Sequence, residues 1–480
     1  MNFRTVFRVL GALLVVSGLT LILPIAFSLY YHDSDLSALL ISLGAMLIAG
    51  AALWVSSPSQ QELGIREGFA IVTFGWTLLA LFGTLPYLLC DAHLSFTDAF
   101  FETISGFTTT GATILNDVEG LSHGVLMWRS LTHWLGGMGI ILLSLAILPM
   151  LGIGGMQLFK AEVPGPSVDK ITPRIQDTAK ALWGVYALIS LIETVLLKMG
   201  GMSVFDALCH TFGIVATGGF STKNIGIAHF NSAYIEWVIT FFMILAGTNF
   251  ALHYRVLKGR FREYMRNSEF RFYCGVIVTA ALVMFLDLFF FQNSSGGESA
   301  RKSVFQVVSL LTTTGFHSAD YETWSTTSQL LLVMLMFFGG CAGSTGGGIK
   351  IVRIYVMIKY GISQFKKLLH PNAVIPIRLN NRTVPPEAVM EVLGFLLLYL
   401  SVFAVASFVM SLLGLDLVTA VSTVISTLGN IGPGIGNIGP TENYAQIPSV
   451  GKWILSFLML TGRLEVYTVL IVFNRYFWAK

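Results

Sequence analysis

Apolar runs of two distinct lengths constrain the fold of this chain more than any other feature of its sequence. Long runs lie near residues 9–31, 36–56, 66–90, 124–152, 180–199, 231–257, 270–292, 326–338, 349–362, 387–414 and 450–478. A helix needs about 20 apolar residues to cross a bilayer. Only 11% of the 480 residues are charged, against about 25% in an ordinary soluble domain. The sequence therefore predicts an all-α polytopic membrane protein and excludes a soluble enzyme.

Four shorter apolar runs lie near residues 98–108, 204–216, 302–312 and 417–428. They are too short to cross the membrane, and they suit half-helices that enter it only where protein or a water-filled cavity shields them. Arginine and lysine gather near the N-terminus and in 153–180, 255–271 and 350–382, which places these segments and both termini in the cytoplasm. Each short run then follows an outward-going helix, so it must enter from the outer face and return to it.

This order of segments predicts four helix–pore-loop–helix repeats, arranged with pseudo-fourfold symmetry around a central ion pore and preceded by an extra helix pair. The predicted boundaries are 1–60 for the helix pair, 61–155 for repeat 1, 156–262 for repeat 2, 263–382 for repeat 3 and 383–480 for repeat 4.

A small polar loop with a glycine follows each half-helix, and the four glycines are Gly111, Gly219, Gly315 and Gly432. Glycine tolerates positive φ and lets backbone carbonyls turn toward an axis. A ring of carbonyl oxygens can replace the hydration shell of K⁺, and the carbonyl end of a half-helix favours a cation. Packing glycines of an ordinary transporter are the alternative, although these prefer GxxxG spacing inside full spans. The predicted K⁺ filter residues are Thr109, Thr110, Gly111, Thr217, Gly218, Gly219, Thr313, Thr314, Gly315, Asn430, Ile431 and Gly432.

A glycine-rich stretch and one arginine are expected to gate this pore from below. The stretch from Gly339 to Lys350 holds six glycines between 339 and 348, too many for a stable helix. Irregular backbone at membrane depth must line a cavity, and a charge such as that of Arg463 usually faces one. A plain hinge, and an arginine that reaches an interface or pairs with Glu465, remain alternatives. The predicted gate residues are Gly343, Ser344, Thr345, Gly346, Gly347, Gly348, Lys350 and Arg463.

Taken together, these features resemble the Trk/Ktr/HKT superfamily of potassium transport proteins, and within it the TrkH/TrkG branch. The resemblance covers almost the whole chain. It rests on Gly-Phe-Thr-Thr-Thr-Gly-Ala-Thr at 106–113, Ala-Thr-Gly-Gly-Phe-Ser-Thr at 216–222, Leu-Thr-Thr-Thr-Gly-Phe at 311–316, Asn-Ile-Gly-Pro-Gly at 430–434, the 339–350 stretch and Gly-Arg-Leu-Glu at 462–465.

The resemblance implies potassium uptake across a bacterial inner membrane, with K⁺ as the substrate held at the filter residues and with no covalent cofactor. It also implies an intramembrane gating loop at 339–350, a pore arginine at Arg463 and a homodimer. A TrkA-like cytoplasmic subunit that binds a nucleotide such as NAD is the implied regulatory partner.

Other functions remain open or are set aside at this stage. A secondary transporter for a small solute would show two inverted halves, and potassium movement could be passive or, as in a symporter, coupled to H⁺ or Na⁺. The fourth loop departs from the Thr-x-Gly pattern with Asn430 and Ile431. The net charge of +3 does not suggest nucleic acid, and the four cysteines are far apart and are expected to be buried. No residue pattern suggests a catalytic centre, so no enzyme activity is expected.

Overall fold

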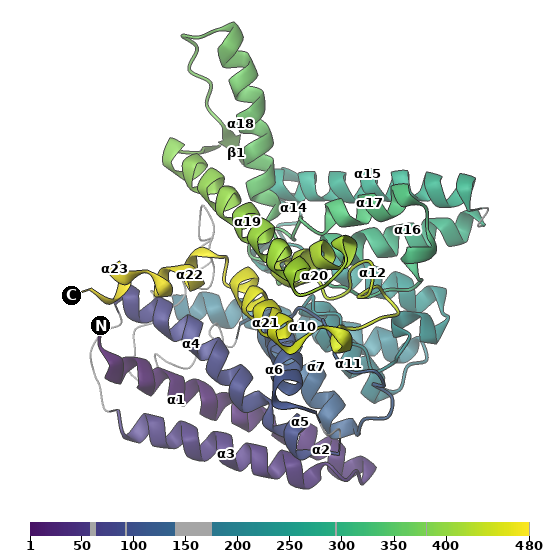
Figure 1. Cartoon of the computed structure of the whole chain (residues 1–480). Helices are drawn as coiled ribbons and strands as arrows, with labels where there is room; N and C mark the ends of the chain where they lie inside the picture. Colours follow the sequence, from purple (N-terminus) through teal and green to yellow (C-terminus); the bar gives the residue numbers. More distant parts are fainter. Residues whose placement is uncertain (58–63, 92–93, 140–174, 293–294, 381, 480) are drawn as a thin grey trace.

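The computed structural model describes residues 1–57, 64–91, 94–139, 175–292, 295–380 and 382–479, and this part of the chain is helical almost throughout (Figure 1). Six of the described helices are long and apolar enough to cross a membrane, or eight if two sharply bent helix pairs each count as one span. The predicted fold class, a helical polytopic membrane protein, is confirmed. The basic segment 153–174 and the predicted boundaries at 60/61 and 155/156 lie outside the described residues.

The helices follow one another in the predicted order. The N-terminal group is α1 (Phe3–Thr20), α2 (Ile22–Tyr31) and α3 (Leu36–Val55), and the first repeat holds α4 (Ile65–Gly83), α5 (Leu85–Leu89), α6 (Phe96–Phe107) and α7 (His123–Gly137). The second holds α10 (Ile175–Met199), α11 (Val204–Val215), α12 (Ala233–Ala246) and α13 (Phe250–Leu257). The third holds α14 (Arg262–Arg266), α15 (Ser268–Phe291), α16 (Gly296–Leu311), α17 (Thr326–Leu335) and α18 (Ile351–Leu369).

A short hairpin, β1 (Arg378–Leu379) and β2 (Arg382–Thr383), leads into the fourth repeat. That repeat holds α19 (Pro386–Leu412), α20 (Leu417–Gly429), α21 (Ser449–Arg463), α22 (Tyr467–Leu470) and α23 (Arg475–Trp478). Short 3-10 helices lie at Gly226–Phe230, Tyr321–Thr323, Tyr444–Gln446 and Ile471–Phe473.

Large apolar side chains remain exposed along the long outer helices. Ile48 of α3 is 74% exposed, Phe291 of α15 is 78% exposed and Leu397 of α19 is 72% exposed. A soluble protein would bury such side chains, whereas the hydrocarbon core of a bilayer solvates them. These helices therefore present their apolar faces to lipid.

The four half-helices α6, α11, α16 and α20 begin in the same way. Each has an N-cap side chain that accepts a hydrogen bond from a backbone N–H three residues on, a contact that satisfies one of the free donors of the first turn. The N-caps are Ser95, Ser203, Ser295 and Asp416. Three of them lie sixteen residues before the loop glycine, whereas Ser295 lies one turn earlier, so α16 is longer than its counterparts.

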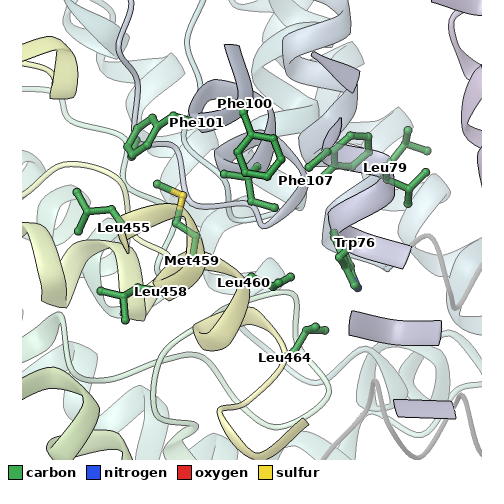
Figure 2. Packing of buried hydrophobic residues seen from close by; sticks show 14 of the residues in the cluster. Trp76, Leu79, Phe100, Phe101, Phe107, Leu455, Leu458, Met459, Leu460 and Leu464 are labelled. Atoms are coloured by element: carbon green, nitrogen blue, oxygen red, sulfur yellow. The ribbon is translucent and has the colours of Figure 1, made fainter. Parts of the chain in front are cut away.

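Three returning helices pack against the half-helix of another repeat. Helix α7 packs on α11, α12 packs on α16, and α21 packs on α6. Figure 2 shows the last of these junctions, where apolar side chains of α21 meet those of α6 and α4. The labelled members of this core are Trp76, Leu79, Phe100, Phe101, Phe107, Leu455, Leu458, Met459, Leu460 and Leu464. Helix α21, near the C-terminus, thus shares one apolar core with α4 and α6 of the first repeat.

Two further returning helices are broken, although only the third was expected to be. Helices α12 and α13 meet at a bend of 101°, and α21 and the segment after it meet at 113°. The first bend follows Ala246 and includes Gly247, a small residue that disfavours continued helix. The second follows Arg463, where Glu465 and Val466 both adopt positive φ. The long apolar runs at 231–257 and 450–478 therefore each form a bent helix pair in place of one straight helix.

Candidate ion pathway

The four loops that follow the half-helices share one backbone conformation. The residue two before each glycine has positive φ, at 53° for Thr109, 55° for Thr217, 59° for Thr313 and 54° for Asn430. The glycines that follow also have positive φ, at 79°, 81°, 81° and 99°. Threonine is β-branched and rarely adopts this region, so three loops hold a strained residue at the same place. Asparagine tolerates it better, which explains how the fourth loop can depart in sequence and keep the same shape.

One hydrogen bond, repeated four times, anchors these loops to their half-helices. The N–H just before each loop glycine donates to the carbonyl of the residue five positions earlier, over 2.7 to 2.9 Å. The four acceptors are Ser105, Gly213, Ser309 and Ser426. All four acceptors are small residues, six positions before the glycine. At this position the chain folds back onto the end of the half-helix.

Each loop glycine lies against a carbonyl of the next repeat. A Cβ added at Gly111 would overlap the carbonyl oxygen of Gly218, and one added at Gly219 would overlap that of Thr314. The third and fourth junctions follow the same rule, since Gly315 meets the carbonyl of Ile431 and Gly432 meets that of Thr110. In each pair the carbonyl belongs to the residue just before the neighbouring glycine. The four loops therefore form a closed ring, and a side chain on any of the glycines would open it.

The ring opens on one side into a cavity of about 250 Å³. All four loop glycines line it, together with the asparagines Asn116, Asn224 and Asn443 of the connecting loops. Asn224 donates to Asp117 over 2.9 Å, and this hydrogen bond holds the pKa of that exposed carboxyl below its ordinary range. Charged side chains also line the cavity. Arg129 is paired with Glu102, Lys223 lies 3.8 Å from Asp206, and Glu442 adds a carboxylate.

The glycine-rich stretch lies directly behind the ring, on the side of the returning-helix breaks. Gly347 donates its N–H to the hydroxyl of Thr313 over 2.7 Å, so the stretch touches a loop residue. Phe250 donates to the carbonyl of Gly343 over 2.9 Å, and Cys341 donates to that of Gly247 over 2.8 Å. The stretch is therefore tied both to the ring and to the break between α12 and α13.

Arg463 and Thr345 join all four repeats just behind the ring. The guanidinium of Arg463, from repeat 4, donates to the carbonyl of Thr345 in repeat 3 over 2.5 Å. It also donates to the carbonyls of Gly136 and Gly137 in repeat 1, over 2.6 and 2.9 Å. The hydroxyl of Thr345 donates to Val215 of repeat 2 over 3.0 Å. The two predicted gate elements are thus parts of one hydrogen-bonded crosspiece.

The remaining predicted gate residues surround this crosspiece. Ser344 donates to the carbonyl of Cys341 over 2.6 Å, and Lys350 donates to the carbonyl of Gly346. Gly343 and Gly348 have positive φ, at 72° and 59°. Glu465, the suggested partner of Arg463, forms an ion pair with Arg353 of α18.

Three histidines near the half-helices are bonded to the backbone. Nδ1 of His133 lies 2.8 Å from the carbonyl of Gly106, and Nδ1 of His210 lies 2.7 Å from that of Asp206. Nε2 of His253 lies 2.9 Å from the carbonyl of Leu245. These contacts favour structural roles over a proton relay.

The described cysteines carry no disulfide; Cys90, Cys209 and Cys341 are buried as expected, whereas Cys274 is only half-buried. Within the described ranges, no group of three or more His, Cys, Asp or Glu side chains could hold a metal ion.

Two charged residues beside the ring, Glu102 and Arg129, were not predicted from the sequence as part of the site. Glu102 lies in the short apolar run near 98–108 and Arg129 in the run near 124–152. Charges inside apolar runs are costly and often functional, so their position was a usable signal.

Comparison with known proteins assigns the chain to a family. Residues 36–478 match the family model of TrkH, described as a cation transport protein. The chain is 42% identical to the Trk system potassium uptake protein TrkH of Escherichia coli (strain K12), over 485 aligned residues that cover both chains fully. It is 33% identical to the Trk system potassium uptake protein TrkG of the same strain, covering all of this chain and 99% of the relative.

A solved structure agrees with these sequence matches. The crystal structure of the potassium transporter TrkH from Vibrio parahaemolyticus superposes with a TM-score of 0.90 at 37% identity, covering 100% of each chain. At this level of similarity along the full length, the chain belongs to the TrkH family of cation transport proteins.

Proposed function

We propose that this protein takes up potassium through the ring of four loops, which acts as a carbonyl-lined selectivity filter. Members of a cation transport family are transporters rather than enzymes, and the relatives are named as potassium uptake proteins. The observation that carries the proposal is the closed contact ring, in which each loop glycine leaves room for the carbonyl of the next loop. Carbonyls held in this way are the ligands with which potassium channels replace the hydration shell of the ion.

The filter residues of this proposal are those expected from the sequence. They are the three residues that end at each loop glycine, with Asn430 and Ile431 in the place of threonines in the fourth loop. Asn430 donates to the hydroxyl of Thr110 over 3.0 Å and to the carbonyl of Met459 over 2.9 Å. The side chain that breaks the sequence pattern therefore supports the ring.

The crosspiece made by Arg463 and the 339–350 stretch is the proposed gate. It lies across the side of the ring opposite the open cavity, and it includes groups from all four repeats. Conduction requires that Thr345 and its neighbours move aside, and a glycine-rich segment can change its backbone conformation at low cost. Helix α18 begins directly after the segment.

We also propose the partners that the family resemblance implies. The far end of helix α18 projects away from the other helices (Figure 1), and this end is exposed and carries Lys366 and Lys367. A TrkA-like, NAD-binding cytoplasmic subunit that engages this end could pull on the gate through α18. We further propose that the protein works as a homodimer in the bacterial inner membrane, and that both of its termini lie on the cytoplasmic side. The ends of the chain lie together, since the rings of Phe3 and Trp478 stack at 6.3 Å.

Measurement of ion selectivity in liposomes tests the proposed filter. With K⁺ on one side and Na⁺ on the other, the parent chain should give a reversal potential set by K⁺. Gly315→Ser should move this potential toward that of Na⁺. The new side chain would overlap the carbonyl of Ile431, and the serine would have to adopt the left-handed conformation, with φ 81°, that the glycine adopts without strain. A reversal potential equal to that of the parent would contradict the assignment of the ring as the selectivity filter. Varying pH and Na⁺ singly in the same preparation separates passive flow from coupled transport.

A further inference from the structure

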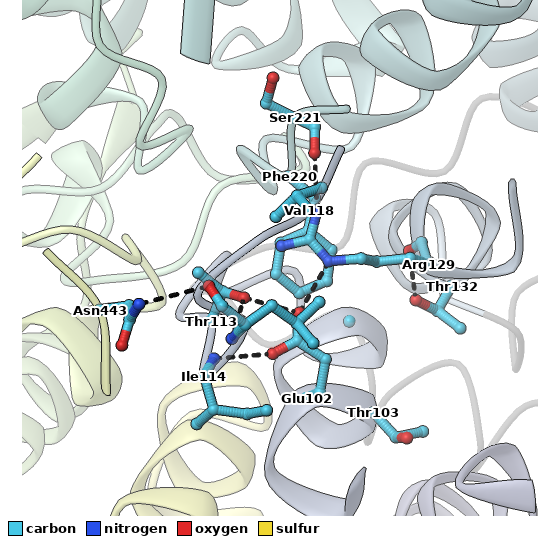
Figure 3. Close-up of polar contacts among 12 residues, drawn as sticks. Glu102, Thr103, Thr113, Ile114, Val118, Arg129, Thr132, Phe220, Ser221 and Asn443 are labelled. Atoms are coloured by element: carbon cyan, nitrogen blue, oxygen red, sulfur yellow. Dashed lines mark hydrogen bonds and ion pairs between the residues drawn. The ribbon is translucent and has the colours of Figure 1, made fainter. Parts of the chain in front are cut away.

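A buried ion pair lies beside the segments that follow the first two loop glycines (Figure 3). Glu102 of half-helix α6 is fully buried, and Arg129 of returning helix α7 is 2% exposed. Nε of Arg129 donates to the carboxylate of Glu102 over 2.7 Å. We call these two residues the Glu102–Arg129 clasp.

Glu102 holds the first loop beyond its glycine. Its carboxylate accepts a hydrogen bond from the hydroxyl of Thr113 over 2.9 Å and one from the N–H of Ile114 over 3.0 Å. With the bond from Arg129, three donors converge on this carboxylate. The segment that follows Gly111 is therefore fixed to the half-helix that precedes it.

Arg129 extends the clasp to the second loop. Its Nη1 donates to the carbonyl of Ser221 over 2.8 Å, and its guanidinium lies 3.5 Å from the centre of the Phe220 ring. Phe220 directly follows the loop glycine Gly219. One side chain thus bonds the half-helix of repeat 1 and the loop of repeat 2.

A second side chain on the same face of α7 makes a parallel connection. His133, four residues after Arg129, has Nδ1 2.8 Å from the carbonyl of Gly106, and its Nε2 accepts from the N–H of Phe220 over 3.2 Å. Residues four apart share one face of a helix. The face of α7 that carries Arg129 and His133 therefore sets the distance between the first half-helix and the second loop.

The equivalent positions in the other repeats carry no acid. Nine residues before the loop glycine, where repeat 1 has Glu102, the others have His210, Gln306 and Thr423. His210 makes a comparable contact within its own repeat, with Nε2 3.0 Å from the hydroxyl of Ser221. Among these four equivalent positions, only that of repeat 1 carries a charged residue that forms an ion pair, and this pair connects repeats 1 and 2.

We propose that the Glu102–Arg129 clasp sets the spacing of the first two loops and, through it, the discrimination between K⁺ and Na⁺. A buried ion pair contributes little net stability compared with a well-packed neutral pair, so stability alone does not account for one placed here. The clasp acts through the loops, and both members are positioning residues. The inference rests on the proposed function, because it assumes that the ring selects the ion.

The test compares ion selectivity in variants of the full chain reconstituted in liposomes. Glu102→Gln/Arg129→Gln removes both charges and leaves no unpaired buried ion, so the variant should fold like the parent. We expect its preference for K⁺ over Na⁺ to fall at least about tenfold, the lower end of the range by which one charge-assisted hydrogen bond favours the bonded geometry. Arg129→Lys keeps the charge but lacks the planar fork that reaches both acceptors, and we expect a similar loss.

An exposed ion pair supplies the matched control. Glu298 and Lys302 pair on half-helix α16 over 2.6 Å, with side chains 41% and 30% exposed. The same glutamine substitutions there should leave the selectivity unchanged.

Two results would contradict the proposed role of the clasp in ion selectivity. One is parental selectivity in both clasp variants. The other is a loss of maximal rate that is equal for K⁺ and Na⁺, which would mean a structural role without influence on ion choice. Failure of the proposed function is distinguishable, because then Gly315→Ser would also leave selectivity unchanged.

Discussion

Removal of the Arg463 side chain should open the pathway in the absence of any partner. Its guanidinium donates hydrogen bonds to Thr345 of the glycine-rich segment and to Gly136 and Gly137 of the first repeat. In Arg463→Ala the link between the segment and the first repeat is lost. A hydrogen bond from a charged donor contributes about 1.5–3 kcal/mol, so loss of the single bond to Thr345 shifts the balance of closed and open forms roughly 10- to 150-fold toward open.

Potassium flux into liposomes that contain the purified protein measures this shift. Arg463→Ala should raise the flux, and Arg463→Lys should lie between this variant and the parent, because an ammonium lacks the planar fork that reaches carbonyls of two elements at once. Arg475→Ala removes an exposed arginine of α23 and should leave the flux unchanged. A flux in Arg463→Ala that is equal to or below that of the parent, at equal protein content, would refute the gate as drawn.

Three further substitutions test separate parts of the structure. Thr345→Val removes the hydroxyl bonded to the second repeat and should raise basal flux about fivefold, for a loss of about 1 kcal/mol; unchanged flux would count against the crosspiece. Asp416→Ala removes the cap that accepts from Thr419 and should cost about 1 kcal/mol, read as a lower Tm of the purified protein, whereas an equal Tm would deny the cap any stabilising role. Arg353→Gln leaves the 7% exposed carboxylate of Glu465 without its charge partner and should cost about 3–5 kcal/mol, so a parental Tm would contradict a buried pair.

The repeat pattern could be predicted from the sequence because it depends on local chemistry. A half-helix needs a cap, a short apolar run and a turn that tolerates positive φ, and each of these has a residue signature. The structure adds the reason for the glycine at position 111, which is the carbonyl of Gly218 in the next repeat. No local pattern contains that contact, since the two residues are brought together only by the packing of repeats.

The clasp and the crosspiece could not be predicted for a related reason. Glu102 and Arg129 were visible as charges inside apolar runs, but their pairing depends on how α6 meets α7. Arg463 was identified as a charge at membrane depth, while its acceptors lie 118 and 327 residues away in sequence. The bend after Ala246 was missed because one glycine in an apolar run does not mark a break when hydropathy alone is considered.

Anomalous scattering from crystals grown in Rb⁺ or Tl⁺ tests the central claim most directly, because it locates the ion itself. If the four loops form a potassium filter, the strongest peak should lie on the axis of the ring, among the carbonyls of Thr110, Gly218, Thr314 and Ile431. Gly315→Ser crystals grown in the same ion should lose or displace this peak. A parent crystal with ordered ions elsewhere along the chain and none within the ring would contradict the account.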